Sequence, residues 1–258
     1  MGLSGKNKPV STNCSLSGWE ISEERRQMKT IVISGGSRGL GMALGEYLYH
    51  QGYRVITFAR GASQSQIKEI VHLEGIDVQE PENFEQLEEF LSQADGLVNN
   101  VGMAYDGILA TQGYESISQI ISVNLTSIIN LTKFYLRLRL KKRMNGNVVT
   151  MSSIISQRGF AGLSTYAATK GALNSLTLAL AREMGPKGFR FNAVLPGYFE
   201  SELSKNLSEA KKQQIIRRTP LGRLATTADI CPIVEFLLSE QSRFITGQLI
   251  SVDGGLTV

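Results

Sequence analysis

Hydrophobic positions along the chain alternate between two spacings. A continuous apolar run at 30–34 (TIVIS) predicts a buried strand, and in 40–48 apolar side chains recur every three or four positions, on one face of a helix. This alternation continues to the end of the chain. Further strands are expected at 53–58, 72–78, 96–99, 147–151, 189–195 and 248–252, and further helices from Pro81 onward, at 114–143, at 165–184 and at 227–238.

Repeated strand–helix units indicate a parallel sheet covered by helices on both faces, because right-handed crossovers leave few other arrangements. We therefore predict a single α/β domain of the doubly wound, Rossmann-like type over 28–258, which suits a chain of 258 residues. Residues 1–27 are polar and lack a sustained apolar period. We interpret them as an N-terminal extension, either disordered or left by a vector.

Composition excludes several classes of protein. No apolar run approaches the roughly 18 residues of a membrane span, and the start of the chain lacks the apolar block of a signal peptide, so we expect a cytoplasmic protein. Two cysteines and two histidines are too few for a disulfide framework or a zinc site, so no metal is expected. A net charge of +4 is far from the concentrated basicity of nucleic-acid-binding proteins.

The first predicted strand leads into a glycine-rich turn, GGSRGLG at 35–41, where the first helix begins. Backbone N–H groups and the helix dipole favour a phosphate there, and glycine lets a pyrophosphate approach the backbone. The spacing differs from the G-x-G-x-x-G form, and a tight turn without a ligand is the alternative. Because strand and helix flank it as required, we predict a cofactor loop formed by Gly35, Ser37, Arg38, Gly39, Leu40 and Gly41.

The end of the second predicted strand indicates which dinucleotide is bound. NAD-binding proteins usually carry an acidic residue there, because a carboxylate accepts a hydrogen bond from the ribose 2′-hydroxyl. Here Ala59 and Arg60 occupy the position. Arg60 and Arg38 together would clamp a 2′-phosphate, so NADP(H) is the predicted cofactor. A solvated surface charge is the alternative for each arginine.

Tyr166 and Lys170 are four residues apart at the start of a predicted helix, so their side chains share one face. A phenol with its usual pKa of about 10 is a poor base at neutral pH, and a neighbouring ammonium favours the phenolate. We therefore expect Lys170 to lower the pKa of Tyr166. An exposed, unrelated pair is the alternative, and the neighbouring residues decide between them.

Polar residues at other strand ends converge on this pair. Ser153 follows the predicted strand at 147–151, and Asn100 and Gly102 follow the one before it. Open α/β sheets bind ligands at the carboxyl ends of their strands. Asn124, on an apolar face of the long helix, needs a partner, either the backbone or an ordered water. These residues complete a candidate catalytic group.

With these motifs the sequence resembles the short-chain dehydrogenases/reductases, from about residue 29 to the end. SGGSRGLG is similar to that family's TGxxxGxG, with Ser34 for Thr, and NNVG to its NNAG, with Val101 adding bulk beside the cofactor. Ser153, Tyr166, Lys170 and Asn124 fall at the family's catalytic positions. The resemblance adds Asp77 and Val78 as an adenine contact, and Pro196, Gly197 and Phe199 on the cofactor side of the sixth strand.

The resemblance implies a mechanism and an assembly. Tyr166 would donate a proton to a carbonyl oxygen held by Ser153 while the nicotinamide delivers hydride to the carbon. Lys170 would bind the nicotinamide ribose, and Asn124 would hold a water that returns the proton. The resemblance also implies a homotetramer, and the apolar set on the long helix is wide enough to leave surface for a partner.

Within the family, GGSRGLG, PLGRLATTADI and ITGQLISVDGG resemble the 3-oxoacyl-(acyl-carrier-protein) reductases of fatty acid or polyketide biosynthesis. This implies reduction of a 3-oxoacyl thioester, although reductases of sugars, steroids and other alcohols share these features. A dinucleotide-binding regulator without turnover is a third hypothesis. Such a protein would not need an intact set of Ser153, Tyr166 and Lys170, so an enzyme is favoured.

Two further segments carry hypotheses. Five cations, at 137, 139 and 141–143, end the long helix, where they either complement its dipole or dock an acidic carrier protein. A nucleic-acid interface is disfavoured, because no aromatic platform is interleaved. Residues 198–219 have a thin apolar stripe, and we expect a lid lined by Phe199, Leu203 and Leu207, with a fixed helix pair as the alternative.

Overall fold

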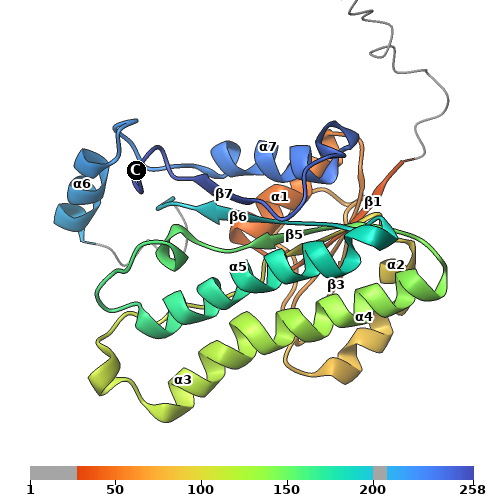
Figure 1. Ribbon diagram of the computed structural model, residues 1–258, viewed down its shortest axis with the longest axis horizontal. Coiled ribbons are helices and arrows are strands. Elements are labelled where there is room, and N and C mark those ends of the chain that lie inside the picture. The colour runs from red at the N-terminus through yellow and green to blue at the C-terminus, as the bar shows by residue number, and fades with distance from the viewer. Residues whose placement is uncertain (1–27, 200–207) are drawn as a thin grey trace, which may run out of the picture.

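Seven parallel strands form one sheet in the computed structural model, which describes residues 28–199 and 208–258 (Figure 1). The strand order is β3-β2-β1-β4-β5-β6-β7, so the chain steps outward from β1 in one direction and from β4 in the other. Ligands bind at such a switch point. The strands are β1 (Thr30–Ser34), β2 (Arg54–Phe58), β3 (Val71–Leu73), β4 (Gly96–Asn99), β5 (Asn147–Met151), β6 (Arg190–Pro196) and β7 (Leu249–Val252).

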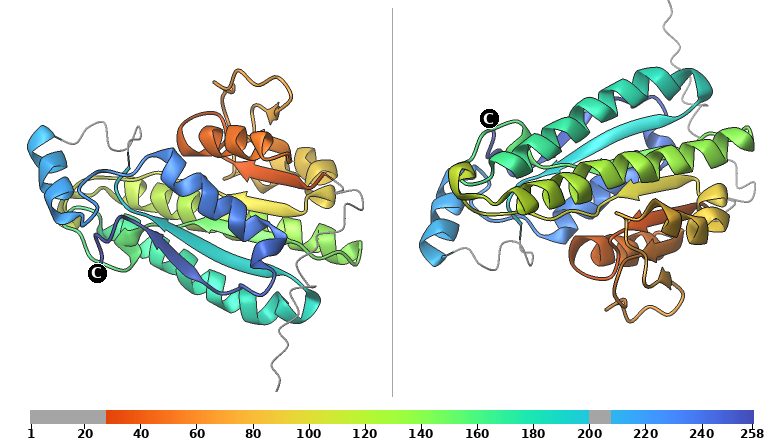
Figure 2. Two further views of the ribbon diagram at one scale, coloured as in Figure 1. Left: turned by 90° about the horizontal axis from the view of Figure 1, so that it is seen from above. Right: turned by 90° about the horizontal axis from the view of Figure 1, so that it is seen from below.

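Helices cover both faces of the sheet, which confirms the predicted doubly wound fold (Figure 2). On one face lie α1 (Gly39–His50) and α7 (Thr227–Leu238). On the other lie α2 (Glu88–Gln93), α3 (Tyr114–Ile121), α4 (Ser127–Lys141) and α5 (Ser164–Met184). The remaining helix, α6 (Glu209–Arg218), lies beside the C-terminus at the edge where the strands end (Figure 1). The predicted extension, 1–27, lies outside the described residues.

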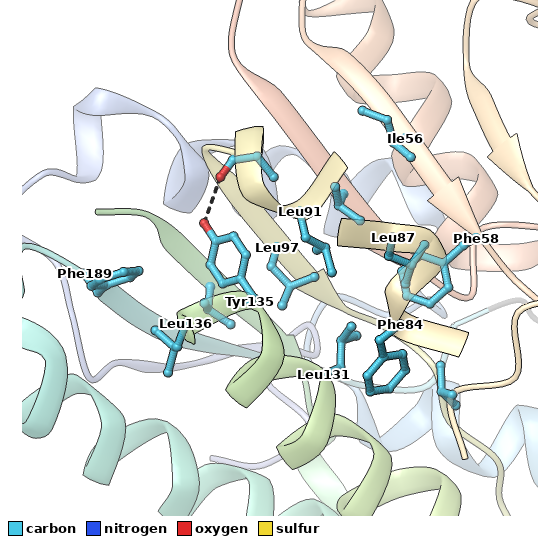
Figure 3. Close-up of a cluster of buried hydrophobic side chains, with 14 of the residues drawn as sticks. Ile56, Phe58, Phe84, Leu87, Leu91, Leu97, Leu131, Tyr135, Leu136 and Phe189 are labelled. Carbon is cyan, nitrogen blue, oxygen red and sulfur yellow. Dashed lines mark hydrogen bonds between the residues drawn. The ribbon is translucent and has the colours of Figure 1, made fainter. Parts of the chain in front are cut away.

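The larger core cluster lies between the sheet and the helices α2, α4 and α5 (Figure 3). Tyr135 is wholly buried in it, and its hydroxyl donates to the carbonyl oxygen of Ala94 at 3.0 Å. Its ring meets Phe189 edge to face, with the centroids 6.5 Å apart. Each buried apolar side chain stabilises the fold by about 1.5–3 kcal/mol. The continuous apolar runs of the strands reflect this two-sided burial.

The structure departs locally from the predicted elements. The helix expected to be continuous over 114–143 contains a π-helical turn, Ser122–Thr126, between α3 and α4. The strand expected at 72–78 is the short β3, because the chain turns at Gly75 with a left-handed φ of +81°. The helix expected from Pro81 begins as a 3₁₀ turn, Pro81–Leu87, before α2. Within 28–199 and 208–258, no helix has both the length and the hydropathy needed to cross a bilayer.

Candidate active site

The glycine-rich turn joins β1 to α1 at the switch point of the sheet. Gly35 has a left-handed backbone (φ +72°), and its N–H and that of Gly36 donate to the carbonyl oxygen of Phe58 at 2.9 and 3.3 Å. A Cβ on Gly36 would lie 2.4 Å from the Cβ of Thr57, and one on Gly41 would lie 2.2 Å from the Gly35 oxygen. The turn is therefore packed tightly against the end of β2.

Gly39 is the position of this turn that faces open space. Its φ is +57°, and an added Cβ would meet no described atom within 4 Å. Arg38, the N-cap residue of α1, is exposed, and its side chain makes no capping hydrogen bond within the described residues. The first amides of α1 are thus open to an anion. This cradle, completed by Ser37 and Leu40, fits the pyrophosphate of a dinucleotide.

The segment after β2 lies against the same turn. The Gln64 N–H donates to the Ser37 carbonyl oxygen at 2.9 Å, so the two loops meet there. Arg60 is exposed, and its guanidinium is 3.9 Å from the carboxylate of Asp77. The predicted adenine contacts differ from each other, because Asp77 pairs with Arg60 whereas the Val78 side chain is buried in the core. The proposed adenosine end is therefore open and lined by exposed charges.

The end of β4 packs against the glycine turn. The two positions that depart from the family pattern, Ser34 at the end of β1 and Val101 after β4, both lie at this contact. The Ser34 hydroxyl donates to the Val98 carbonyl oxygen and accepts from the N–H groups of Asn100 and Val101 at 3.0 and 3.3 Å. The Asn100 amide donates to the carbonyl oxygens of Ser34 and Gly35, both at 3.2 Å. Serine thus supplies the hydroxyl that threonine would, and Val101 packs against the turn.

Ser153 and Tyr166 bring two hydroxyl groups together at the end of β5. Ser153 is buried, has an extended backbone, and accepts from the Ile155 N–H at 3.3 Å. Tyr166 lies in the first turn of α5, and its phenol interacts with the Ser153 hydroxyl. Burial raises the pKa of Tyr166 to about 12, while the Ser153 hydrogen bond opposes that shift. The phenol therefore carries a proton at neutral pH.

Lys170 lies one helical turn further along α5. Its ammonium is 5.7 Å from the centroid of the Tyr166 ring and donates to the carbonyl oxygen of Met151 at 2.7 Å. Burial lowers the pKa of Lys170 to about 8. The structure corrects the expectation that Lys170 lowers the pKa of Tyr166. The pKa of Tyr166 is raised, chiefly because burial desolvates the phenol, and the group that opposes this rise is the Ser153 hydroxyl.

Asn124 occupies the π-helical turn between α3 and α4, and its side chain is fully buried. Its Oδ1 accepts from the Met103 N–H and its Nδ2 donates to the Met103 carbonyl oxygen, both at 2.8 Å. Of the two partners that the sequence left open, the backbone and an ordered water, the structure shows the backbone. A Cβ on Gly102 would lie 3.4 Å from the Lys170 Nζ and 3.6 Å from the Asn124 Oδ1, so the three residues meet. Single π turns often mark functional sites.

An apolar wall that sequence reasoning missed stands beside Tyr166. Phe160 and Tyr198 meet edge to face at 5.9 Å, and both pack in one cluster with Leu163 and Tyr166. Asp106 lies at its rim, where its Oδ1 would be 2.8 Å from a Cβ on Gly162. Burial and the charge of Asp106 raise the pKa of Tyr198. These residues follow strand ends, which was the available signal, but loop conformation decides which of them point inward.

Phe199 does not line this wall. It bridges to Ala225 and packs against the cluster beneath α1 and α7, whereas its neighbour Tyr198 faces Tyr166. The described contacts of Phe199 are therefore with the core and not with this wall, because neighbouring side chains point to opposite sides of an extended segment. Leu203 and Leu207 lie outside the described residues. The Gly197 N–H donates to the Val252 carbonyl oxygen at 2.9 Å, which fixes the turn after β6.

The basic cluster is smaller than the sequence suggested. Arg139 is buried, and its guanidinium donates to the carbonyl oxygens of Asn145 and Ser92, so it closes the end of α4 instead of facing a partner. Lys142 donates to the Ser92 hydroxyl at 2.9 Å. The cluster precedes β5 and Ser153 follows it, so the two lie at opposite ends of the strands of the sheet.

Comparisons with known proteins agree with this geometry. The model of a family described as enoyl-(acyl carrier protein) reductases matches residues 35–257. The 3-oxoacyl-(acyl-carrier-protein) reductase FabG of Escherichia coli is 33% identical over 237 residues, covering 88% of this chain and 97% of the relative.

Two solved structures extend the comparison to cofactors. A short-chain dehydrogenase from Leptospira borgpetersenii with bound NAD+ is 27% identical, with a TM-score of 0.84 over 90% of this chain and 94% of that one. A gluconate 5-dehydrogenase from Burkholderia cenocepacia in complex with NADP and tartrate is 28% identical, with a TM-score of 0.83 over 89% and 95%. Similar folds thus bind either dinucleotide.

Proposed function

Because the chain belongs to the short-chain dehydrogenases/reductases, oxidoreductases of CH–OH and C=O groups, we propose that it reduces the ketone of a 3-oxoacyl thioester to a secondary alcohol with NADPH. One observation carries the proposal. The hydroxyls of Ser153 and Tyr166 meet beside Lys170, and an apolar wall flanks them. A ketone needs such a pair of donors at its oxygen, and an acyl chain needs the wall.

The residues of this site have distinct roles in the proposed reaction. Ser153 holds the substrate oxygen, and Tyr166 donates its proton to that oxygen as negative charge develops there. A bound nicotinamide cofactor would supply the hydride. The pKa of about 12 keeps the Tyr166 proton in place until the oxygen becomes basic enough to take it. Lys170, buried beside the ring, would bind the nicotinamide ribose, and Asn124 would hold the water that returns the proton.

The preference for NADP(H) is supported by the charges at the adenosine end. Arg38 and Arg60 are both exposed there, and Ala59 stands where an acidic residue would repel a 2′-phosphate. The carboxylate of Asp77 lies 3.9 Å from Arg60, a distance at which an exposed pair contributes little. Arg60 therefore remains available to a phosphate.

A second candidate is the reduction of a keto-sugar acid, which the similar gluconate 5-dehydrogenase favours. Two features of this chain argue against it. The wall of Phe160, Leu163 and Tyr198 offers no hydrogen-bonding groups for a polyol beyond one hydroxyl. The carboxylate of Asp106 at the rim would repel an anionic substrate.

We also propose a cytoplasmic homotetramer that receives its substrate on an acyl carrier protein. Ile121, Ile129 and Leu178 are 40–43% exposed on the helices of one face, which suits a partner subunit. The exposed cations at the end of α4 lie at the opposite end of the strands from Ser153, so a carrier protein docked on them would not face the site of the same subunit. Light scattering at micromolar concentration should give a tetramer, and a monomer would contradict this assembly.

The substrate assignment is tested by measuring NADPH oxidation with a short 3-oxoacyl thioester, a cyclic ketone and a keto-sugar acid. We expect the thioester to have the highest kcat/KM, because only it matches both the donors and the wall. A keto-sugar acid that is reduced more efficiently would favour the second candidate.

A further inference from the structure

His72 joins three segments at the adenosine end of the site. It lies on the edge strand β3, in register with Thr57 of β2. Its Nδ1 is 2.7 Å from the Thr57 Oγ1, and its Nε2 is 2.9 Å from the carbonyl oxygen of Gly61. A carbonyl oxygen only accepts, so Nε2 donates, and in the neutral ring Nδ1 accepts the proton of the Thr57 hydroxyl. Both ring nitrogens are therefore engaged with the protein.

Thr57 transmits this contact to the glycine turn. Its side chain is 1% exposed, and a Cβ on Gly36 would lie 2.4 Å from its own Cβ. No side chain therefore separates Thr57 from the backbone that would cradle the pyrophosphate. Contact runs without a gap from His72 through Thr57 to Gly36.

On the other side of the ring, the bond to Gly61 links His72 to the segment that carries Arg60. Residues 59–70 contain no regular helix, although every one of them is described. The segment is held by separate bonds, among them the Gln64 N–H to Ser37 and the Ser65 hydroxyl to the Glu46 carboxylate at 2.7 Å. The bond from His72 fixes the carbonyl oxygen immediately after Arg60.

We propose that His72 is a positioning residue for the 2′-phosphate of the cofactor, which it never touches. By tying Gly61 and Thr57 together, it acts with the bond from the Gly75 N–H to the Arg60 carbonyl oxygen (3.3 Å) to hold Arg60 at a fixed distance from the glycine turn that carries Arg38. This inference rests on the proposed use of NADP(H). Loss of the imidazole bonds loosens the segment next to Arg60, although its other bonds remain. Binding of the 2′-phosphate must then order Arg60, and the lost conformational entropy weakens that binding. Ligands without that phosphate lose little.

The variants are His72→Phe, which keeps a ring but loses both bonds, and His72→Gln, whose amide can donate to Gly61 and accept from Thr57. Thr57→Val removes only the hydroxyl and serves if His72→Phe folds poorly. His50 is the other histidine of the chain, at the exposed end of α1, so His50→Gln is the matched control.

Calorimetry measures Kd for NADPH, NADH, 2′,5′-ADP and 5′-AMP. For His72→Phe we expect Kd to rise about tenfold for NADPH and 2′,5′-ADP and to change less than about threefold for NADH and 5′-AMP. His72→Gln should recover most of the loss, Thr57→Val should show part of it, and kcat at saturating NADPH should stay within about twofold of wild type.

An equal loss for ligands with and without the 2′-phosphate, or a lowered melting temperature with unchanged Kd values, would overturn the proposal and leave His72 a structural residue. The wild-type ratio of Kd for NADH and NADPH tests the proposed cofactor separately. If that ratio shows no preference, the comparison of 2′,5′-ADP with 5′-AMP still decides the role of His72.

Discussion

The two ends of the candidate site are built differently. At the catalytic end, Lys170 and Asn124 are 3% and 0% exposed, and their side chains bond to main-chain atoms of β5 and of the loop after β4. At the adenosine end, the Arg60 side chain is 75% exposed and its partner is a distant carboxylate. One end is fixed by the core, and the other depends on loops.

This difference separates what each end contributes. Buried polar groups are costly unless hydrogen-bonded, so the groups at the catalytic end have few alternative positions, as proton transfer requires. Exposed arginines keep their mobility and add affinity through charge. Substitutions at the first end should change kcat, and those at the second should change cofactor affinity.

The largest effect is expected at the catalytic end, from Tyr166→Phe. Loss of the transferable proton should lower kcat about 10²- to 10⁴-fold, while Kd for NADPH stays near the wild-type value. Steady-state kinetics and calorimetry measure the two quantities. Tyr114→Phe, at a 90% exposed position, is the control. If Tyr166→Phe kept more than about a tenth of the wild-type kcat, the general-acid role would be wrong.

At the adenosine end, replacing Arg38 and Arg60 together with Gln should raise Kd for NADPH roughly 10- to 100-fold, about 1.4–2.8 kcal/mol in total, because exposed charges contribute less than the full 1.5–3 kcal/mol of each charged hydrogen bond. Kd for NADH should change far less, and kcat at saturation should be retained. Equal weakening of both dinucleotides would remove the 2′-phosphate assignment, and a fall in kcat would break the separation between the two ends.

Lys170→Met tests the cost of burial at the catalytic end. Native Lys170 releases its proton near pH 8, whereas unfolded lysine keeps it to about 10.5, so the unfolded state binds more protons between these values and stability rises with pH there. The buried ammonium therefore lowers the free energy of unfolding most below pH 8. We expect the variant to be inactive but more stable at pH 7 by about 1–2 kcal/mol.

Thermal unfolding at pH 7 and at pH 10 measures this difference. The advantage of Lys170→Met over wild type should shrink as the pH rises through the interval from 8 to 10.5. A variant that is less stable than wild type at pH 7 would show that the bond to Met151 outweighs the desolvation of the ammonium.

The smallest effect is expected at the rim of the substrate wall. Asp106→Asn removes a charge but keeps the size of the side chain, so kcat/KM for a carboxylate-bearing ketone should rise about threefold while a neutral thioester is reduced as before. Competition between the two substrates measures the ratio. An unchanged ratio would mean that Asp106 plays no part in specificity.

The same contrast explains what the sequence could predict. Continuous apolar strands and amphipathic helices follow from burial, so the fold and the convergence of Ser153, Tyr166 and Lys170 were predictable. Three features depend on contacts between side chains that are far apart in the chain. They are the π-helical turn that contains Asn124, the packing of Tyr198 beside Tyr166 and the burial of Arg139. The His72 bonds also join segments whose spacing carries no motif.

The central claim is that this site reduces a ketone, and its most direct test is the fate of the hydride. The enzyme is incubated with a 3-oxoacyl thioester and NADPH deuterated at the transferred position, and the product is examined by mass spectrometry. We predict a 3-hydroxyacyl thioester with one deuterium at C3, formed at least about 100-fold more slowly by Tyr166→Phe. A parallel incubation contains a 2-enoyl thioester in place of the 3-oxoacyl thioester. If the ketone is left unchanged while the 2-enoyl thioester is reduced to the saturated chain, the account is contradicted.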